Sequence, residues 1–380
     1  MSESTNVSAG FAENTKTGPV GVGVIGAGNI STQYLTNLTS FPDVEVRFIA
    51  DILPEAAKAQ AEKFGVPAHG TVDELLADPE IEIVVNLTIP KVHAEVALQA
   101  VRAGKNVWTE KPIALDRESG RALLDAAHAA GLRVACAPDT FLGGGIQTAR
   151  RLLEDGAIGR PQTALTLMQQ PGPESWHPNP AFLFQEGAGP LFDVGPYYVT
   201  ALIQLFGPVK RVAAVASKAK PVRTIGSGPL AGQTFEVTVP SHVSAVFEFE
   251  NGQTSQSIFS FDSKLPRTLF EVTGVDGALE VNDPNMFVGE LVLHSDGDPK
   301  TIVVEGEMAA RGTGVVELAR AIRAGVPERA SGEQAYHALD IMVSTIEAAD
   351  TGEWVDVVST FTPTPVLPEG WDPAEATLSR

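Results

Sequence analysis

Positive charges and long apolar runs are scarce in this sequence of 380 residues. Its 27 lysines and arginines face 47 aspartates and glutamates, which gives a net charge of −20. A surface of that sign repels nucleic-acid phosphates and anionic lipid, so we expect no nucleic-acid partner and no attachment to a membrane. No apolar run reaches the roughly 18 residues that could span a bilayer, and the first twenty residues lack the basic and apolar segments of a secretory signal. We therefore expect a cytoplasmic protein.

Cysteine is also nearly absent. The single cysteine, Cys136, excludes an internal disulfide and a metal site built from several thiolates, and we expect no metal. Because Cys136 lies in an apolar run, it is expected to fill a buried strand rather than to act as a nucleophile. Glycine and proline, with 36 and 27 residues, stay below the share typical of low-complexity chains, so the chain should fold, and its length predicts two domains.

The first region, residues 19–140, alternates short β-branched runs with alanine-rich helical stretches. Strands are expected at 20–25, 44–49, 81–87, 105–109 and 132–136, with helices at 31–40, 54–64, 91–103 and 116–130 between them. This alternation is typical of βαβ units, which build a parallel sheet covered on both faces. The sequence therefore predicts an N-terminal α/β domain, a Rossmann-type doubly wound parallel sheet, preceded by a flexible tail over residues 1–18.

The second region, residues 141–360, differs because most of its strands follow one another without helices. Asn251-Gly252 is the strongest short signal for a hairpin, and the strand before it should point Val243, Ala245, Phe247 and Phe249 to one face. Further strands are expected at 163–169, 209–216, 269–273, 278–281, 290–294 and 301–304, with helices at 313–324 and 332–349. These elements predict an α+β domain with a large open, mostly antiparallel sheet. A proline-rich tail over residues 361–380 is expected to follow.

The turn after the first strand is rich in glycine. The run Gly26-Ala27-Gly28-Asn29-Ile30-Ser31 opens a helix, with Ser31 in the place of a third glycine. Gly26 permits a tight turn, and Gly28 lets the backbone approach a pyrophosphate, which the N-terminus of the helix attracts. We predict that this turn, including Asn29 and Ile30, holds a dinucleotide. A plain turn between strand and helix is the alternative.

Asp51 lies 20 residues after Ser31, at the end of the second expected strand. A carboxylate there accepts hydrogen bonds from the adenosine ribose and repels a 2′-phosphate, so it predicts NAD rather than NADP as cofactor. Asp51 could also be a loop cap before Pro54. The nearest basic residue on the loop side is Lys58, which makes NADP the less favoured cofactor.

Residues 86–115 resemble the signature of the glucose-fructose oxidoreductase, inositol dehydrogenase and MocA family, abbreviated Gfo/Idh/MocA. The matching positions are Thr88 and Pro90 after the third strand, His93 in the next helix, and Glu110-Lys111-Pro112 after the fourth strand. Residues 187–208 are similar to a second motif of this family, so the resemblance extends from Val20 to about Val355.

This resemblance implies hydride transfer between a nicotinamide and a hydroxyl carbon of a sugar, cyclitol or related polyol. It implies that Lys111 contacts the substrate hydroxyl and the nicotinamide ribose, and that the backbone around Thr88 and Pro90 lines the nicotinamide. Lys111 is expected at the carboxyl end of a parallel strand, where such sheets bind ligands. Glu110 would orient Lys111 or pair with it, and His93 is either a packed helix histidine or a cofactor contact.

The second motif departs from the family, because Tyr197 stands where the family has a histidine. If residues 193–197 lie in one helix, Asp193 and Tyr197 share a face, since they are four residues apart. A cation within about 4–6 Å favours a phenolate, so Lys111 could lower the pKa of Tyr197 by about a unit or more. We therefore predict Tyr197 as proton acceptor and donor, with Lys111 as its electrostatic partner. Asp193 would orient substrate or lysine, and simple packing roles are the alternative.

A second source of the proton acceptor is the aromatic stretch at residues 174–184. Trp176 and His177 have the aromatic surface and polar tips that sugar pockets use, so we predict that both contact substrate and that His177 is an alternative to Tyr197. Asp139 follows the fifth strand and is expected to bind substrate at the edge of the same site. The glycines at 143–145 are expected to form a hinge, because no basic residue lies near enough to make a phosphate site.

Three functions fit these features. The first is an NAD-dependent dehydrogenase of sugars, polyols or glycosides, with Lys111, Asp193 and Tyr197 as catalytic residues. The second is a glycosidase or lyase that uses NAD transiently. The third is a dinucleotide-binding sensor without catalysis, which the presence of Lys111 and Asp193 disfavours. The substrate is expected to be neutral, and the exposed sheet predicts a homodimer or homotetramer.

Overall fold

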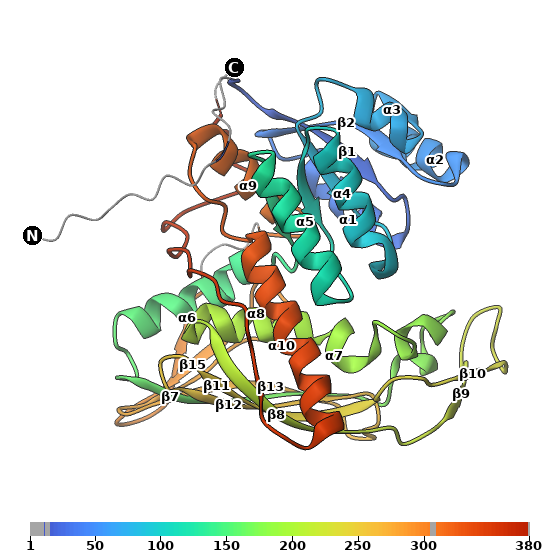
Figure 1. Cartoon of the computed structure of the whole chain (residues 1–380). Coiled ribbons are helices and arrows are strands. Elements are labelled where there is room, and N and C mark those ends of the chain that lie inside the picture. The colour runs from blue at the N-terminus through green and yellow to red at the C-terminus, as the bar shows by residue number, and fades with distance from the viewer. Residues whose placement is uncertain (1–10, 12–15, 305–308, 379–380) are drawn as a thin grey trace, which may run out of the picture.

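The computed structural model describes residue 11 and residues 16–304 and 309–378. Two sheets organise this part of the chain, and Figure 1 shows them as an upper and a lower body. The upper sheet has six strands and the lower sheet nine. The predicted fold class is confirmed, because a parallel Rossmann-type sheet is followed by a mostly antiparallel one.

The upper sheet has the strand order β3-β2-β1-β4-β5-β6, and all its pairings are parallel. Its strands are β1 (Val20–Ile25), β2 (Val44–Ala50), β3 (Ala68–Gly70), β4 (Ile83–Asn86), β5 (Asn106–Thr109) and β6 (Val134–Cys136). Its helices are α1 (Asn29–Leu38), α2 (Pro54–Phe64), α3 (Val72–Ala77), α4 (His93–Arg102) and α5 (Arg117–Ala129). The order reverses between β1 and β4, and such sheets bind ligands at the carboxyl ends of the strands around that point.

Two elements of this part of the chain, the strand β3 and the helix α3, were not predicted. They have three and six residues, which is too short for a hydrophobic period to show. The start of α3 is nevertheless fixed locally, because Thr71 and Glu74 form a capping box in which each side chain accepts the other's backbone N–H.

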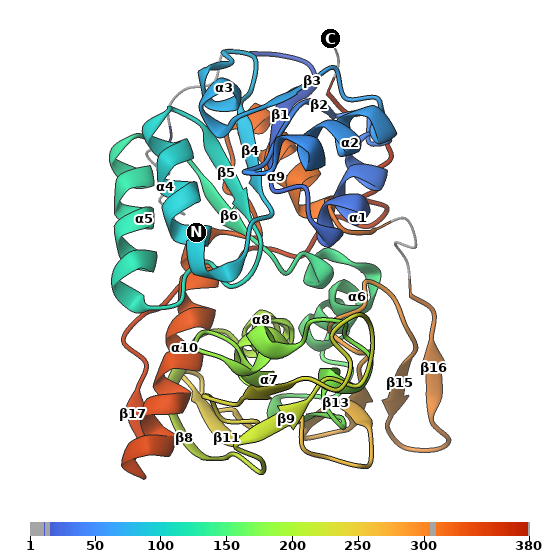
Figure 2. The ribbon, with the colours of Figure 1, turned by 90° about the vertical axis from the view of Figure 1, so that its right-hand side faces the viewer.

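Helix α9 (Thr313–Ala324) lies on this sheet, although its residues come late in the chain (Figure 2). Along β5, Val107 packs with α4 and α5, whereas Trp108 points to the opposite face, which α1 and α9 cover. The approach of α9 is so close that a Cβ at Gly314 would lie 2.0 Å from the Trp108 ring. The late part of the chain therefore completes the core on the face of the sheet that α1 covers.

The lower sheet has the order β16-β15-β14-β13-β7-β12-β11-β8-β17, and the β7–β12 pair is its parallel pairing. Its strands are β7 (Pro161–Gln169), β8 (Val209–Ser217), β11 (His242–Phe249), β12 (Thr254–Ser260), β13 (Arg267–Gly274), β14 (Ala278–Glu280), β15 (Leu291–His294), β16 (Lys300–Ile302) and β17 (Val355–Asp356). The predicted hairpin at Asn251-Gly252 joins β11 to β12. A separate hairpin is formed by β9 (Val222–Thr224) and β10 (Thr234–Glu236).

Helices cover one face of the lower sheet (Figure 1). They are α6 (Gly144–Glu154), α7 (Gly189–Asp193), α8 (Gly195–Phe206) and α10 (Gly332–Thr351). The side chains predicted to share this face, Val243, Ala245, Phe247 and Phe249, are buried. On the opposite face, where the described residues place no helix, Leu165 and Val215 are exposed.

The proline-rich C-terminal stretch packs back onto the molecule in its described part, residues 361–378. Leu367 is buried and its N–H donates to Gln147 Oε1 at 2.7 Å. Further on, the Leu378 N–H donates to the buried Asp43 carboxylate at 2.9 Å. Of the tail expected over residues 1–18, residues 1–10 and 12–15 lie outside the described residues. No described helix has both the length and the apolar character needed to cross a bilayer.

Candidate active site

The glycine turn between β1 and α1 is shaped for a close approach of the backbone. Gly26 has φ +104°, and a Cβ there would lie 2.7 Å from the Leu87 carbonyl, so a larger residue does not fit. Gly28 is the N-cap of α1, and a Cβ there would meet no atom within 4 Å. Ser31 points inward, where its hydroxyl donates to the Gly28 carbonyl at 2.6 Å. The space before the N-terminus of α1 is therefore open to an anionic group.

Asp51 follows β2, and its carboxylate lies against this turn. Oδ2 accepts the Ala27 N–H at 2.7 Å, and Oδ1 accepts the Leu53 N–H at 2.8 Å. The side chain is thus a loop cap and also a carboxylate beside the glycine turn, which are the two roles that the sequence left open. It is partly exposed, so its remaining lone pairs can accept hydrogen bonds from a ribose diol.

Apolar side chains flank the same edge of the sheet. Ile52, after β2, is 91% exposed, and Ile89, after β4, is 65% exposed. Because β2 and β4 lie on either side of β1, these side chains border the turn from both sides, as the apolar walls of a ligand site do. Asn29 is exposed and Ile30 partly buried in the first turn of α1. The open turn, the carboxylate and the apolar walls together fit a dinucleotide.

Thr88 and Pro90 follow β4, in the segment that leads through the short helix η1 (Pro90–Val92) into α4. His93 is buried, with Nδ1 2.8 Å from the Pro112 carbonyl oxygen and Nε2 3.0 Å from the Thr88 carbonyl oxygen. Burial lowers its pKa, against the effect of the two carbonyls. Of the two roles left open for His93, the structure favours the packed histidine, which fixes the backbone on both sides of the site.

Lys111 lies just after β5 and reaches the second domain. Its ammonium contacts the Asp193 backbone carbonyl and Asp193 Oδ1, the latter at 3.1 Å. The Lys111 Nζ also lies 5.2 Å from the centre of the Tyr197 ring. Burial alone would lower the pKa of Lys111, but the charges of Asp193 and Tyr197 outweigh burial and raise the pKa above its ordinary value. Lys111 is therefore charged at neutral pH and lies against both predicted partners.

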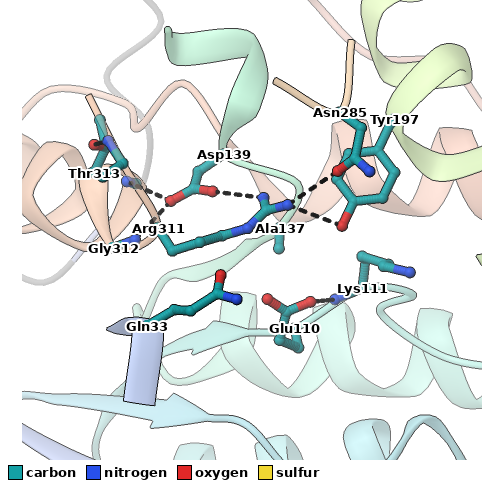
Figure 3. Close-up of polar contacts among 12 residues, drawn as sticks. Gln33, Glu110, Lys111, Ala137, Asp139, Tyr197, Asn285, Arg311, Gly312 and Thr313 are labelled. Carbon is teal, nitrogen blue, oxygen red and sulfur yellow. Dashed lines mark hydrogen bonds and ion pairs between the residues drawn. The ribbon is translucent and has the colours of Figure 1, made fainter. Parts of the chain in front are cut away.

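Arg311, from the segment before α9, joins this group (Figure 3). Its Nη2 donates to the Tyr197 hydroxyl and to Asn285 Oδ1, both at 3.1 Å, and its Nη1 donates to Asp139 Oδ1 at 3.3 Å. Burial would lower the pKa of Arg311, but Tyr197 and Asp139 raise it overall. Tyr197 therefore lies beside two cations, Lys111 and Arg311.

The pKa of Tyr197 shifts in the opposite direction from the prediction. Burial raises it, Lys111 and Arg311 lower it, and the net value lies above that of an ordinary tyrosine. The sequence indicated a neighbouring cation but not the depth of burial, which decides the sign. The protein therefore holds Tyr197 as a neutral phenol at neutral pH, with two cations in place to stabilise a phenolate.

Asp193 and Tyr197 do not share one helix, as their spacing predicted. Helix α7 ends at Asp193 and α8 begins at Gly195, with Val194 between them. Pro196 in the first turn of α8 has no N–H with which to continue the hydrogen bonds of α7, so a new helix starts there. The two residues are nevertheless close to the same ammonium, because Lys111 contacts Asp193 and lies over the Tyr197 ring.

The expected substrate contact of Asp139 is corrected by the structure. Its side chain is fully buried, and Oδ2 accepts the backbone N–H groups of Gly312 and Gly314 at 2.9 and 3.3 Å. Burial raises its pKa, against the effect of Arg311. Asp139 therefore fixes Arg311 and the start of α9, and it leaves no exposed face for a substrate.

Glu110 fixes the backbone of Lys111 and also contacts α1. Its Oε2 accepts the Lys111 N–H at 3.0 Å, and its Oε1 accepts the Tyr34 hydroxyl at 2.8 Å. Trp108 Nε1 donates to the Tyr34 oxygen at 3.2 Å. Burial and the charge of Glu110 raise the pKa of Tyr34 well above its ordinary value. Glu110 thus links Lys111 to α1, the helix that begins at the glycine turn.

The aromatic stretch at residues 174–184 has contacts of its own. Trp176 is 62% exposed, and its ring centre lies 5.5 Å from that of His177, which in turn lies 5.6 Å from Phe182. The Asn179 N–H donates to His177 Nδ1 at 3.1 Å. None of the contacts described for His177 is with Lys111 or the phenol of Tyr197. That Trp176 and His177 contact substrate stays a prediction.

Two family models match this chain in sequence. The model of the Gfo/Idh/MocA oxidoreductase family, with an NAD-binding Rossmann fold, matches residues 20–137, and the C-terminal domain model of the same family matches residues 146–280. The chain belongs to the Gfo/Idh/MocA family. The resemblance carried by residues 86–115 and 187–208 is thereby confirmed, and the chain is an NAD(P)-dependent oxidoreductase.

Relatives of this family member include three enzymes with named substrates. Trans-1,2-dihydrobenzene-1,2-diol dehydrogenase of Mus musculus is 27% identical over 267 residues, 68% of this chain and 73% of that protein. 1,5-Anhydro-D-fructose reductase of Ensifer adhaerens is 24% identical over 344 residues, 88% of this chain and 98% of that protein. Levoglucosan dehydrogenase of Pseudarthrobacter phenanthrenivorans is 27% identical over 294 residues, 71% of this chain and 74% of that protein.

Solved structures share the fold over most of the chain. Levoglucosan dehydrogenase in complex with NADH and L-sorbose superposes with a TM-score of 0.77 at 23% identity, and the match covers 90% of this chain and 100% of that one. An NAD-binding oxidoreductase from Klebsiella pneumoniae gives a TM-score of 0.79 at 21% identity with the same coverage. At these identities the likeness concerns the fold.

Sequence reasoning missed three residues of the site in this family member. Arg311 lies 172 positions from its partner Asp139 and belongs to no motif. Asn285 lies in the loop after β14, and Tyr34 looks like ordinary packing in α1. The one available signal was the run Arg311-Gly312-Thr313-Gly314, where an arginine precedes a glycine-rich helix start.

Proposed function

We propose that this protein oxidises a secondary alcohol of a neutral sugar, cyclitol or glycoside with NAD, and that it catalyses the reverse reduction. The observation that carries the proposal is the meeting of Lys111, Asp193 and Tyr197 beside the carboxyl edge of the parallel sheet. When bound, NAD accepts a hydride from the alcohol carbon. The names of the relatives support this substrate class, because levoglucosan, 1,5-anhydro-D-fructose and a dihydrodiol are small neutral ring compounds.

Tyr197 handles the hydroxyl proton in this proposal. In the reduction direction its neutral phenol donates a proton to the carbonyl oxygen, and the phenolate that remains is stabilised by Lys111 and Arg311. In the oxidation direction the phenolate accepts the proton of the alcohol. Because the pKa of Tyr197 lies above its ordinary value, only a small phenolate fraction is present at neutral pH, and oxidation should accelerate as the pH rises.

Lys111 binds the reacting oxygen. An ammonium has three hydrogen-bond donors, and Asp193 accepts from Lys111 through its backbone carbonyl and through Oδ1. A third donor is then available to a substrate oxygen beside Tyr197. Asp193 acts by aiming the ammonium, and Glu110 acts by holding the Lys111 backbone.

NAD is the proposed cofactor because of Asp51. Its carboxylate lies 2.7 Å from the Ala27 nitrogen of the glycine turn, close to where an adenosine ribose would bind. A 2′-phosphate there would face a like charge, whereas a free ribose diol can donate to the carboxylate. We therefore expect a lower KM for NAD than for NADP.

A substrate screen tests the proposal. Neutral sugars, inositols and glycosides are supplied with NAD or NADP, and the absorbance of the reduced cofactor is followed. Net accumulation of NADH with at least one compound is the expected result. Cleavage of a glycoside without net NADH would instead indicate a glycosidase or lyase, and NAD binding without any turnover would indicate a sensor.

We also propose that the open face of the lower sheet joins copies of the chain. A mostly apolar row crosses this face, because the strand register aligns Val215, Ser244, Ile258, Leu167 and Leu269. Val215 is 68% exposed, and exposed apolar rows of this kind are typical of interfaces. Sedimentation should give a dimer or tetramer, and a monomer at micromolar concentration would contradict the proposal.

A further inference from the structure

A pocket of about 300 Å³ lies beside Tyr197 in the second domain. It is bordered by the end of β7, the start of β13, the loop after β14 and the junction of α7 and α8. Its polar lining consists of Gln169, Gln170, Tyr198, Arg267, Thr268, Asp283 and Asn285. This volume is at the lower end of the range for small-molecule sites and leaves room for one sugar ring.

The pocket adjoins the groups proposed to carry out the reaction. Asn285 lines the pocket and accepts a hydrogen bond from Arg311 Nη2 at 3.1 Å, and the same nitrogen donates to the Tyr197 hydroxyl (Figure 3). Val194, which follows Asp193, also lines it. A molecule that presents one hydroxyl to Tyr197 can therefore extend into the pocket.

Tyr198 is a buried tyrosine in the lining of the pocket. Its side chain is fully buried, and its ring is fixed against Phe259 and Phe270, with ring centres 5.8 and 6.4 Å away. Its hydroxyl lies close to the side chains of Asp283 and Thr268, but among the residues that the structure describes it makes no hydrogen bond of good geometry. A buried hydroxyl without a partner is unfavourable, because folding removes it from water. A ligand hydroxyl would supply the missing hydrogen bond.

The other polar groups suit hydroxyls better than charged ligands. Burial raises the pKa of Asp283, and burial together with the charge of Asp283 raises the pKa of Tyr198, so negative charge is disfavoured on these two groups. The amides of Gln169, Gln170 and Asn285 offer donors and acceptors side by side. A sugar hydroxyl both donates and accepts, whereas a phosphate would need a cluster of cations, and the lining holds a single arginine, Arg267.

We propose that this pocket binds a second, non-reacting sugar ring, so that the substrate is a disaccharide or similar glycoside rather than a free monosaccharide. The inference rests on the proposed function, because the reacting ring is placed at Lys111 and Tyr197. The second ring then hydrogen-bonds to Tyr198, and its binding fixes which hydroxyl of the first ring meets Tyr197.

The test compares matched sugars with wild-type protein, Tyr198→Phe and Asp283→Asn in the presence of NAD. The probes are glucose against cellobiose and maltose, and galactose against lactose and melibiose. We expect at least one disaccharide to exceed its monosaccharide in kcat/KM by about tenfold, the effect of one well-made hydrogen bond. Tyr198→Phe keeps the packed ring and removes only the hydroxyl, so it should abolish this advantage and leave monosaccharide turnover nearly unchanged. Asp283→Asn should reduce the advantage in the same direction.

The outcomes separate this inference from the proposed function. Monosaccharides that react as well as their disaccharides, or an advantage that persists in Tyr198→Phe, would overturn the inference while leaving a sugar dehydrogenase. If none of the sugars reacts, the proposed function fails for them, and saturation-transfer NMR with cellobiose, maltose and lactose then decides about the pocket. Signals that vanish in Tyr198→Phe support the subsite, and signals that are absent or unchanged in the variant overturn it.

Discussion

Two sets of buried charges in this protein use the same residue types to different ends. The set between the two domains comprises Lys111, Asp193, Arg311, Asp139 and Tyr197. The second set is one ion pair, Arg133 and Glu328, which we call the closed pair. Arg133 Nη1 lies 2.8 Å from Glu328 Oε2, and the pair joins the start of β6 to the segment after α9. Side chains of the closed pair are 4% and 6% exposed, whereas Lys111 and Asp193 keep 15% and 32%.

The closed pair uses its charges to hold segments together. Arg133 Nη1 donates to Glu328 and to the Val326 carbonyl, and the Phe11 ring lies 4.0 Å from the guanidinium. Lys111, by contrast, directs its ammonium at the edge where ligands bind, next to a phenol. Burial and pairing alone therefore do not indicate reactivity, and position at the carboxyl edge of the parallel sheet is the feature that separates the two sets.

The largest expected effect is on turnover, from Lys111→Met. Loss of the ammonium removes the donor to the reacting oxygen and one cation that stabilises the phenolate, so kcat should fall by about 10²–10⁴-fold. The free energy of unfolding should change less than in a closed pair, because the partner Asp193 keeps 32% of its side chain exposed and can be hydrated. Steady-state kinetics with the best sugar of the screen and urea unfolding measure the two effects. A kcat within tenfold of wild type would contradict the role of Lys111 in turnover.

The converse variant, Arg133→Met, should act on stability alone. It leaves Glu328 buried without a partner, which should lower the free energy of unfolding by about 3–5 kcal/mol. The turnover per folded molecule should equal that of wild type. Urea unfolding and kcat on the same samples check this, and Arg133→Met with Glu328→Gln should recover part of the stability. A loss of kcat without a loss of stability would contradict the structural role of the closed pair.

The free energy of unfolding should also depend on pH through His337, a buried histidine outside the active site. Burial lowers the pKa of His337 to about 4, and its Nε2 accepts the Val209 N–H at 2.9 Å. The unfolded chain binds this proton near pH 6.5 and the folded chain only near pH 4, so stability falls as the pH drops through that window, by up to about 3 kcal/mol. Urea unfolding at a series of pH values should show this fall in wild type. The fall should be smaller in His337→Gln, and parallel curves would refute the assignment.

The smallest effect on turnover among the active-site variants is expected from Arg311→Met. Removal of a cation beside the phenol should raise the pKa of Tyr197 further, so that the rise of the oxidation rate moves to higher pH by about one unit. At pH 8 this corresponds to a loss of about tenfold in kcat. Arg311→Lys keeps the charge and should retain most of the activity. A loss of activity with an unshifted pH profile would mean that Arg311 has only a structural role.

The parallel sheet was largely predictable because each βαβ unit carries its own signals. The strand runs, the glycine turn and Asp51 lie within about 30 residues of one another, so local pattern fixes their places. Short elements such as β3 and α3 have too few residues to show a hydrophobic period. Helix α6 was missed for another reason, since it starts with Gly144-Gly145, which are poor helix formers.

The site was predictable only as far as its motifs reach. Lys111, Asp193 and Tyr197 came from two motifs, and the structure brings them together. Arg311 could not be found in this way, because tertiary packing alone places it next to Asp139 and Tyr197. The sign of the Tyr197 pKa shift failed for the same reason, since it depends on burial between two domains rather than on spacing.

The central claim is that the Tyr197 hydroxyl carries the proton of the reaction. The most direct measurement compares Tyr197→Phe with Tyr336→Phe, which removes a hydroxyl from a buried tyrosine of α10. Rates of NADH formation and the Kd for NAD are measured for both. The account predicts that Tyr197→Phe loses about 100-fold or more of kcat with an unchanged Kd, while Tyr336→Phe retains activity. Full activity in Tyr197→Phe would contradict it.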